Sequence, residues 1–310
     1  MITLFSASTQ VNNLSFYCLL CYDVLLGGAA MSRAALLILL IVLMPMTASA
    51  ANFSFKNVRN GVYAAIAEPG GKAASNSLII VTSYQVIVAG AHFIPETINE
   101  ILDFVKTITP IPVRYIILTH HHRGFNHVDF DLPANVEIIA SGRTWQALKS
   151  EFRQIKNQVT FFNSGLTMKR GSTLLVLNAT ERSHSEGDVF VYLPEEGVLF
   201  TSDLMFHNVS GYMGDANFQD WIGTLELLAS MEVKSVVPGL GDVTTTDGIL
   251  QFQEFFRAFT TEVLRLVGKG LEVEAAKRQF SLPQYEKMPG FQVFFDANFR
   301  RAFNELRALK

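Results

Sequence analysis

Short runs of apolar residues alternate with amphipathic stretches along most of the chain. Residues 77–81 and 85–89 are apolar runs separated by a Thr-Ser-Tyr segment, which predicts a β-hairpin. Residues 95–110 begin and end with proline and place apolar side chains three or four positions apart, which predicts an amphipathic helix. Residues 113–118 predict a buried strand. Further strands are predicted over residues 136–140, 174–177, 189–193, 198–201 and 233–237, with a turn at 194–197.

The last third of the chain is predicted to be helical. One helix is expected over residues 218–231 and another after Asp247, where phenylalanines recur along one stripe. A final helix carries a second apolar stripe, formed by Phe295, Phe299, Ala302, Phe303, Leu306 and Leu309. We expect both stripes to pack on the main body rather than to bind a cofactor. The order of the elements predicts sheets that are covered by helices on their outer faces.

Residues 31–50 have the pattern of a secretory signal peptide. Arg33 provides a positive charge, residues 34–44 form an uncharged apolar stretch, and the Ala-Ser-Ala at 48–50 matches a cleavage site. The apolar stretch is shorter than the ~20 residues that a membrane span needs. We therefore expect cleavage near Ala50 and a periplasmic or secreted mature protein. An uncleaved membrane anchor is the alternative.

Residues 31–50 form a complete leader if translation begins at Met31. We therefore expect residues 1–30 to be an upstream extension. A start at Met1 is the alternative. Both cysteines, Cys18 and Cys21, lie in that extension, and no βαβ pattern surrounds their C-x-x-C spacing. The mature chain is then free of cysteine. This excludes a disulfide framework and a cysteine nucleophile.

Composition narrows the class of protein further. Hydrophobic residues make up 49% of the chain and charged residues 17%, which excludes a disordered protein. The formal net charge of −3 excludes a broad basic surface for nucleic acid. Much of the excess apolar character lies in residues 1–50. We therefore expect no stable membrane insertion once the leader is removed.

The strongest chemical signal is a histidine-rich segment directly after the predicted strand at 113–118. Of the 7 histidines, His120, His121, His122 and His127 lie here. Side chains two positions apart in an extended segment point the same way, so the first and third of these can face one ligand. Neutral imidazoles are suited to zinc. His121 and His127 are additional to the pair formed by His120 and His122. By itself such a segment could equally be solvent-exposed.

Two further segments carry side chains of the same kind. His184 lies in a Ser-His-Ser-Glu-Gly-Asp segment between two predicted strands, and Asp203 follows another predicted strand. Residues 238–242 read Pro-Gly-Leu-Gly-Asp, although a lone G-x-G does not identify a phosphate site. The isolated His92 and His207 are expected to be polar surface groups or to support other side chains.

Taken in this order, the segments resemble the metallo-β-lactamase superfamily. Its pattern is a strand-end Thr-His-x-His-x-Asp-His, a single His near Gly-Asp, an Asp after a strand, and Pro-Gly-His-Gly. The match covers residues 77–243 and implies an α+β fold, a metallo-β-lactamase αββα sandwich over residues 51–245 with a helical extension over 246–310. The extension, with its segment at 298–306, looks like the exported branch called quinoprotein relay system zinc metallohydrolases.

The resemblance implies a ligand set. It assigns His120, His122 and His184 to one zinc ion, with Asp203 as the residue that is kept from a second metal site. Three imidazoles and a water form the ligand set of a catalytic zinc centre. In that setting Asp203 could orient the water or act as a general base.

The chain also departs from the family pattern. Gly124, Phe125 and Leu240 stand where the family has its Asp, the adjacent His and the last His, and none of these side chains offers a lone pair. Gly90 stands where many members carry a supporting Asp. The resemblance therefore implies that the second metal site is lost.

Two functions are consistent with these observations. The first is an exported, mononuclear zinc hydrolase of a small ester, lactone, amide or thioester. The second is a non-catalytic relative, with or without a metal, that binds a small ligand or a partner in an exported redox pathway. The zinc content of the purified mature chain distinguishes them, because its absence at neutral pH excludes the first.

Overall fold

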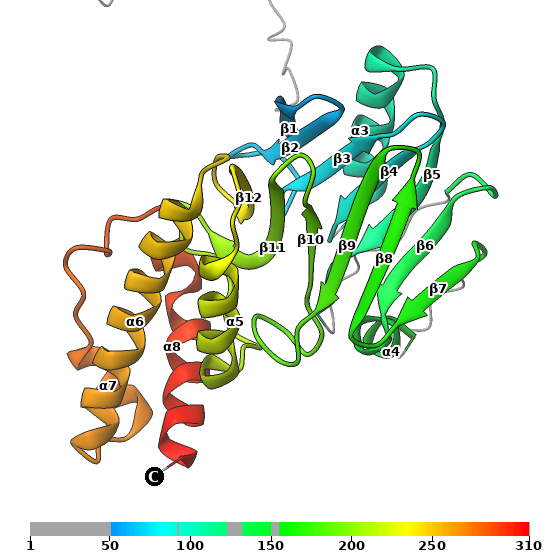
Figure 1. Cartoon of the computed structure of the whole chain (residues 1–310). Coiled ribbons are helices and arrows are strands. Elements are labelled where there is room, and N and C mark those ends of the chain that lie inside the picture. Colours follow the sequence, from blue (N-terminus) through cyan, green and yellow to red (C-terminus); the bar gives the residue numbers. More distant parts are fainter. Residues whose placement is uncertain (1–50, 92, 123–131, 150–154, 310) are drawn as a thin grey trace, which may run out of the picture. The chain divides into compact units, whose positions relative to one another are not determined.

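Two β-sheets and the helices that cover them form the part of the chain that the computed structural model describes, residues 51–91, 93–122, 132–149 and 155–309 (Figure 1). Several predictions lie outside these described residues: the extension at 1–30, the leader at 31–50, His92, Gly124, Phe125 and His127. The described residues belong to one compact unit.

The first sheet has its strands in the order β1-β2-β3-β4-β5-β6-β7. Strands β1 to β4 pair antiparallel, and β4 to β7 pair parallel. The hairpin predicted from the apolar runs is confirmed as β3 and β4, where Leu78 lies opposite Ala89. The strands of this sheet are β1 Phe53–Arg59, β2 Val62–Ala67, β3 Ser77–Val81, β4 Val86–Gly90, β5 Val113–Leu118, β6 Glu137–Ser141 and β7 Val159–Phe162.

The second sheet has the order β12-β11-β10-β9-β8. Strands β10 and β11 form the second predicted hairpin, and its turn contains Gly197 with a φ of 66°. Strand β12 pairs parallel to β11 at the edge of the sheet, where Pro238 is tolerated although it cannot donate a hydrogen bond. The strands of this sheet are β8 Gly165–Arg170, β9 Thr173–Ala179, β10 Val189–Leu193, β11 Val198–Phe206 and β12 Ser235–Leu240.

The alternation of side chains along β4 produces the layers of the fold. Ile87 and Ala89 lie in the apolar core between the two sheets. Val86 and Val88 point to the opposite face, where they pack with helix α3 (Pro95–Ile108). A strand that is buried on both faces is a continuous apolar run, which is why the sequence pattern identified it.

Helices from the C-terminal third cover the outer face of the second sheet (Figure 1). Residues of α5 (Phe218–Ser230), α6 (Thr246–Gly268) and α8 (Phe291–Ala308) share one apolar cluster with β11 and β12. Helix α7 (Val273–Gln279) contacts α6 and α8. Helix α4 (Gly142–Lys149) lies beside β6 on the first sheet. The layers follow the predicted order α, β, β, α.

The two phenylalanine stripes lie inside this helical layer. Phe252 and Phe256 of α6, and Phe299 and Phe303 of α8, are buried in the cluster shared with β11 and β12. Leu309 was predicted to extend the second stripe, which is wrong: α8 ends at Ala308, and Leu309 is 61% exposed. The boundary that sequence analysis placed between the sandwich (residues 51–245) and the helical extension (residues 246–310) stays a prediction.

The sequence patterns missed β1, β2, β7 and β8. Strands β1, β7 and β8 lie at sheet edges, where polar side chains are common and the apolar run is lost. Strand β11 is also longer than predicted, because it continues past Thr201 to Phe206. The prediction that Asp203 follows a strand is therefore wrong, since Asp203 lies within β11.

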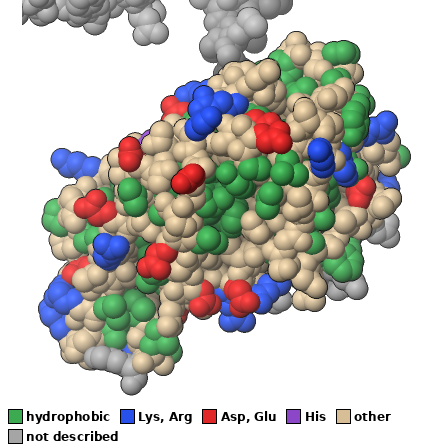
Figure 2. Space-filling view, viewed as in Figure 1, with side chains coloured by type: hydrophobic (Ala, Val, Ile, Leu, Met, Phe, Trp, Pro, Cys, Tyr) green, Lys and Arg blue, Asp and Glu red, His purple; other side chains and the backbone are tan. Residues whose placement is uncertain are grey.

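The described residues show two further features, one of the helices and one of the surface. None of the helices in the described ranges combines the length and the apolar character needed to cross a membrane. On the face shown in Figure 2, side chains of both charge signs are interspersed around a patch of apolar side chains.

Candidate metal centre

Three buried histidines converge where strand ends of the two sheets meet. His120 and His122 follow β5, and His184 lies in the loop between β9 and β10. One ligand atom from each ring lies within 4.8 Å of the other two. Their ring centroids are 4.7, 4.8 and 5.2 Å apart. The structure thus brings together the three histidines that the resemblance assigned to one metal ion.

Thr119 anchors the segment that carries the first two histidines. Its N–H donates to the carbonyl of Gly90 on β4, and its carbonyl accepts from the N–H of Val189 on β10. Its hydroxyl also lies 2.8 Å from the hydroxyl of Ser202 on β11. The start of the histidine segment is therefore bonded to both sheets, which restricts where the following imidazoles can lie.

Asp215, between β11 and α5, orients His122. Its Oδ2 lies 2.8 Å from Nδ1 of His122. This hydrogen bond holds the pKa of Asp215 below its ordinary value, so the group is an ionised carboxylate at neutral pH. A carboxylate only accepts, so Nδ1 carries the proton and Nε2 keeps a lone pair. Sequence analysis missed Asp215, because it lies 93 positions from His122 and outside any motif.

The ring nitrogens of the cluster lie close enough to share one partner. Nε2 of His122 lies 2.8 Å from Nε2 of His184. Because Nε2 of His122 keeps a lone pair, either the Nε2–H of a neutral His184 donates to it or both nitrogens bind one cation. Three buried imidazoles that converge in this way form a donor set that could hold a metal ion.

A carboxylate from β11 faces the same cluster. Oδ2 of Asp203 lies 3.6 Å from Nε2 of His120 and 3.7 Å from Nε2 of His184. Burial raises the pKa of Asp203 to about 7, while the neighbouring His122 acts in the opposite direction. A cation beside this group would favour its ionised form. The carboxylate of Asp203 thus lies beside two of the three histidines.

A bulge in β11 sets the position of Asp203. The pairing with β12 shifts register at Ser202, whose φ of 47° is unusual for a residue other than glycine. On the neighbouring strand, Gly239 permits a close approach. A Cβ at that position would lie 2.2 Å from Oδ1 and 2.6 Å from Cα of Asp203. Gly239 therefore makes room for the carboxylate of Asp203.

Asp188 shapes the loop that carries His184. Its carboxylate accepts hydrogen bonds from the backbone N–H and the hydroxyl of Ser185, at 2.9 and 2.7 Å. Burial raises the pKa of Asp188, against the effect of these hydrogen bonds. The side chain is directed at its own loop, which gives it a structural role.

Aromatic rings form the inner wall of the cluster. The ring centroids of Trp221 and Phe206 lie 5.5 and 5.9 Å from that of His184. The ring of Tyr212 lies 5.3 Å from that of His122. An apolar wall limits access of water on this side and strengthens electrostatic interactions inside the site.

A cleft of about 410 Å³ borders the cluster at His122. Its volume lies within the range of sites for small molecules. His121, which sequence analysis left as an additional histidine, is buried and lines this cleft together with His122 and Asp215. Three arginines also line it: Arg143, Arg182 and Arg301.

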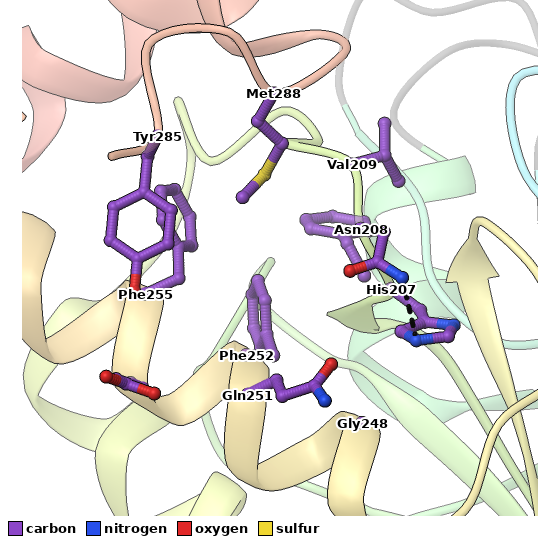
Figure 3. A pocket seen from close by; sticks show the side chains of 11 residues that line it. His207, Asn208, Val209, Gly248, Gln251, Phe252, Phe255, Tyr285 and Met288 are labelled. Carbon is purple, nitrogen blue, oxygen red and sulfur yellow. Dashed lines mark hydrogen bonds between the residues drawn. The ribbon is translucent and has the colours of Figure 1, made fainter. Parts of the chain in front are cut away.

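A smaller pocket of about 220 Å³ lies between the end of β11 and α6 (Figure 3). Phe252, Phe255 and Tyr285 line it with apolar surface. His207 lies at its margin, 3.0 Å from the side-chain amide of Asn208. His207 is thus separate from the histidine cluster and serves as a natural comparison for it.

Two positions at which the chain departs from the family pattern lie among the described residues. A Cβ at Gly90 would lie 2.6 Å from Oγ of Ser77 and 2.9 Å from Cζ of Phe93, so the site has no room for a larger side chain. Leu240 packs against the apolar cluster under the helices. Gly90 and Leu240 are thus both packed closely against neighbouring residues.

Comparisons with known proteins agree with this architecture. No protein-family model matches the chain. The chain is similar to the solved structure of a metallo-beta-lactamase from Pontibacter korlensis, with 21% sequence identity and a TM-score of 0.58. The similarity covers 66% of this chain and 99% of that one. The protein therefore has a metallo-β-lactamase-like fold with additional C-terminal helices, and a histidine triad that could hold a metal ion.

Proposed function

We propose that the protein is an exported zinc hydrolase with one metal ion, held by His120, His122 and His184. Its substrate would be a small ester, lactone, amide or thioester. The observation that carries the proposal is the convergence of three buried imidazoles on one point, with the carboxylate of Asp203 beside two of them. His122, one of these three histidines, lines a cleft that is large enough for a small molecule.

The chemistry of the donors supports zinc. Imidazole is a common zinc ligand, and catalytic sites pair three protein ligands with an open position. Asp215 adds the carboxylate that often orients a metal-binding histidine through its other ring nitrogen. A zinc ion held there would supply Lewis acidity, which polarises a carbonyl group and makes water more acidic.

Asp203 is proposed to move the proton. Its Oδ2 faces the point on which the histidines converge. A cation held there would favour the ionised form of Asp203, and this carboxylate could then accept a proton from an attacking water and return it to a leaving group. The Asp203→Asn variant should keep its metal and lose about 10²- to 10⁴-fold in kcat.

The single metal ion is proposed from the side chains that differ from the family pattern. Gly124, Phe125 and Leu240 offer no lone pair to a second ion. Gly124→Asp, Phe125→His and Leu240→His, introduced together, should raise the metal stoichiometry above that of the unmodified chain. An unchanged stoichiometry would show that these positions do not face the cluster.

Export is proposed from the leader pattern at 31–50 and from the likeness of the tail to an exported branch of the superfamily. Sequencing the amino end of the protein recovered from cell fractions tests this. A mature end near Ala51 supports export, and retention of Met31 in the isolated protein contradicts it.

Metal analysis tests the central claim. Full-length protein in zinc-replete buffer at neutral pH should carry about one equivalent of zinc. His120→Ala and His184→Ala should each lose it, and His207→Ala is the matched control that should keep it. Failure of the unmodified chain to bind zinc would refute the proposal. If the protein binds zinc but hydrolyses none of a panel of esters, lactones, amides and thioesters, the alternative of a non-catalytic ligand-binding protein is favoured.

A further inference from the structure

The pocket between the end of β11 and α6 lies apart from the three histidines proposed to hold a metal ion (Figure 3). Its volume of about 220 Å³ is below the ~300–1,000 Å³ of most ligand sites, so it suits a small molecule. The buried ring of Phe206 lines the pocket, and its centroid lies 5.9 Å from that of His184. Phe206 thus borders both the pocket and the cluster, but none of the three histidines lines the pocket.

Helix α6 supplies one wall of the pocket. Four residues on one face of this helix line it: Gly248, Gln251, Phe252 and Phe255. The ring centroids of Phe252 and Phe255 are 6.0 Å apart, and both side chains are buried in the helical layer. The phenylalanine stripe that packs α6 on the second sheet therefore also lines the pocket.

The segment between α7 and α8 supplies a second wall. Tyr285 and Met288 line the pocket, and Figure 3 shows the side chain of Met288 pointing into it. The ring of Tyr285 packs edge-on against that of Phe255, with centroids 5.0 Å apart. The carbonyl of Pro289 accepts a hydrogen bond from the N–H of Ser210 at 2.8 Å. These contacts hold the second wall against α6 and the end of β11.

The polar lining groups give the pocket a negative charge. Glu254 is the only Asp, Glu, Lys or Arg among the described residues that line it. Nδ1–H of His207 donates to the carbonyl of Asp242, and its Nε2 accepts from the side-chain amide of Asn208, each at 3.0 Å. This is the hydrogen-bond pattern of a neutral imidazole. Burial and the nearby carboxylate of Glu254 raise the pKa of Tyr285, so its hydroxyl also stays neutral.

The charge of Glu254 is not balanced by a neighbouring side chain. In the described part of the chain, no lysine, arginine or histidine forms an ion pair with it. Arg257 on α6 and Lys287 beside Met288 are close to the walls along the chain, and neither of them lines the pocket. A cation is therefore the ligand whose charge suits this pocket.

We propose that the pocket binds a small organic ammonium ion. The faces of aromatic rings attract cations, and the carboxylate of Glu254 adds a direct charge interaction. An anion would meet this carboxylate with no lysine or arginine among the lining residues. The ligand packs against Phe252, Tyr285 and Met288, which exclude water from its alkyl groups. This site is additional to the proposed hydrolase function and does not depend on it.

Choline and 3,3-dimethylbutan-1-ol test the proposal, because they differ only in a quaternary nitrogen against a carbon atom. Full-length protein with ¹³C-labelled methionine methyl groups contains 9 such residues, and Met288→Leu identifies the signal of Met288. Choline should shift this signal, and the alcohol should bind about tenfold more weakly. Glu254→Gln and Tyr285→Leu should each weaken choline binding about two- to fivefold. Glu226→Gln, at an exposed position on α5, is the matched control.

Equal binding of choline and the alcohol would overturn the proposal, because the pocket would then not recognise charge. An unchanged Met288 signal would also overturn it, as would equal weakening by Glu226→Gln and Glu254→Gln. Glu254 is exposed, so its substitution tests the site even if Tyr285→Leu does not fold. His120→Ala should bind choline as the unmodified chain does. Loss of choline binding in that variant would place the probe at the histidine cluster and contradict the assignment.

Discussion

Nδ1 of His122 and Oδ2 of Asp215 lie 2.8 Å apart, and this contact fixes which ring nitrogen faces the centre of the cluster. The carboxylate accepts a hydrogen bond from Nδ1–H, so that Nε2 is available to a metal ion. Asp215 lies in the segment between β11 and α5, and the bond from Arg301 to Ala216 links that segment to α8. The additional helices are therefore connected to the geometry of the site.

Removing this contact should weaken metal binding. Asp215→Ala should lower the affinity for zinc about 10- to 100-fold, because the tautomer and orientation of His122 are no longer fixed. Competition titration with a coloured chelator measures the change. Asp103→Asn, on the exposed face of α3, is the control and should leave affinity unchanged. Equal zinc affinity in Asp215→Ala would show that the contact does not support the metal site.

The close approach of Gly239 to Asp203 predicts a strong effect of one added methyl group. Gly239→Ala should destabilise the protein by about 1–3 kcal/mol, because the new Cβ overlaps atoms of Asp203. Gly223→Ala, on α5 with no atom within 4 Å of the new Cβ, should instead stabilise by about 0.5–1 kcal/mol. Urea denaturation measures both. Similar values for the two variants would contradict the packing described for β11 and β12.

The shared cluster of the tail and the second sheet predicts that they unfold together. Phe256→Ala should cost about 3–5 kcal/mol through loss of buried area and creation of a cavity. Leu309→Ala, at an exposed position, should change stability by less than about 0.5 kcal/mol. Calorimetry should show one transition in both variants. A separate early transition in Phe256→Ala would instead place the tail in a domain of its own.

An ion-pair group between α7 and α8 predicts a dependence of stability on pH. Hydrogen bonds from Arg300 and Lys277 lower the pKa of Asp296 from its ordinary 3.8 to about 2. Because the pKa of Asp296 is lower in the folded protein than in the unfolded chain, this group stabilises the fold at pH values above its unfolded pKa. This stabilisation is lost as the pH falls from about 4 to about 2. Asp296→Asn should flatten that part of the profile slightly, because the group is exposed. Glu286→Gln is the control, and an identical profile for both variants would refute the assignment.

The apolar pattern identified the elements whose environment is uniform along their length. Strand β4 is buried on both faces and α3 on one, so each has a simple period in the sequence. Edge strands such as β8 were missed, because one side of an edge strand faces solvent and tolerates polar residues. The extension of β11 past Thr201 depends on a bulge and on Gly239, neither of which has a local sequence signal.

The sequence by itself determined that sheets are covered by helices and that His120 and His122 can face one ligand, because strand periodicity and spacing are local properties of the chain. The αββα sandwich came from the resemblance of its motifs to a known family. Only the tertiary structure decided that Asp215, Arg143 and Arg301 reach the same cleft. Such contacts join segments separated by loops and helices, so they depend on how the layers pack. The support of the metal-binding histidines and the charge of the cleft are consequences of that packing.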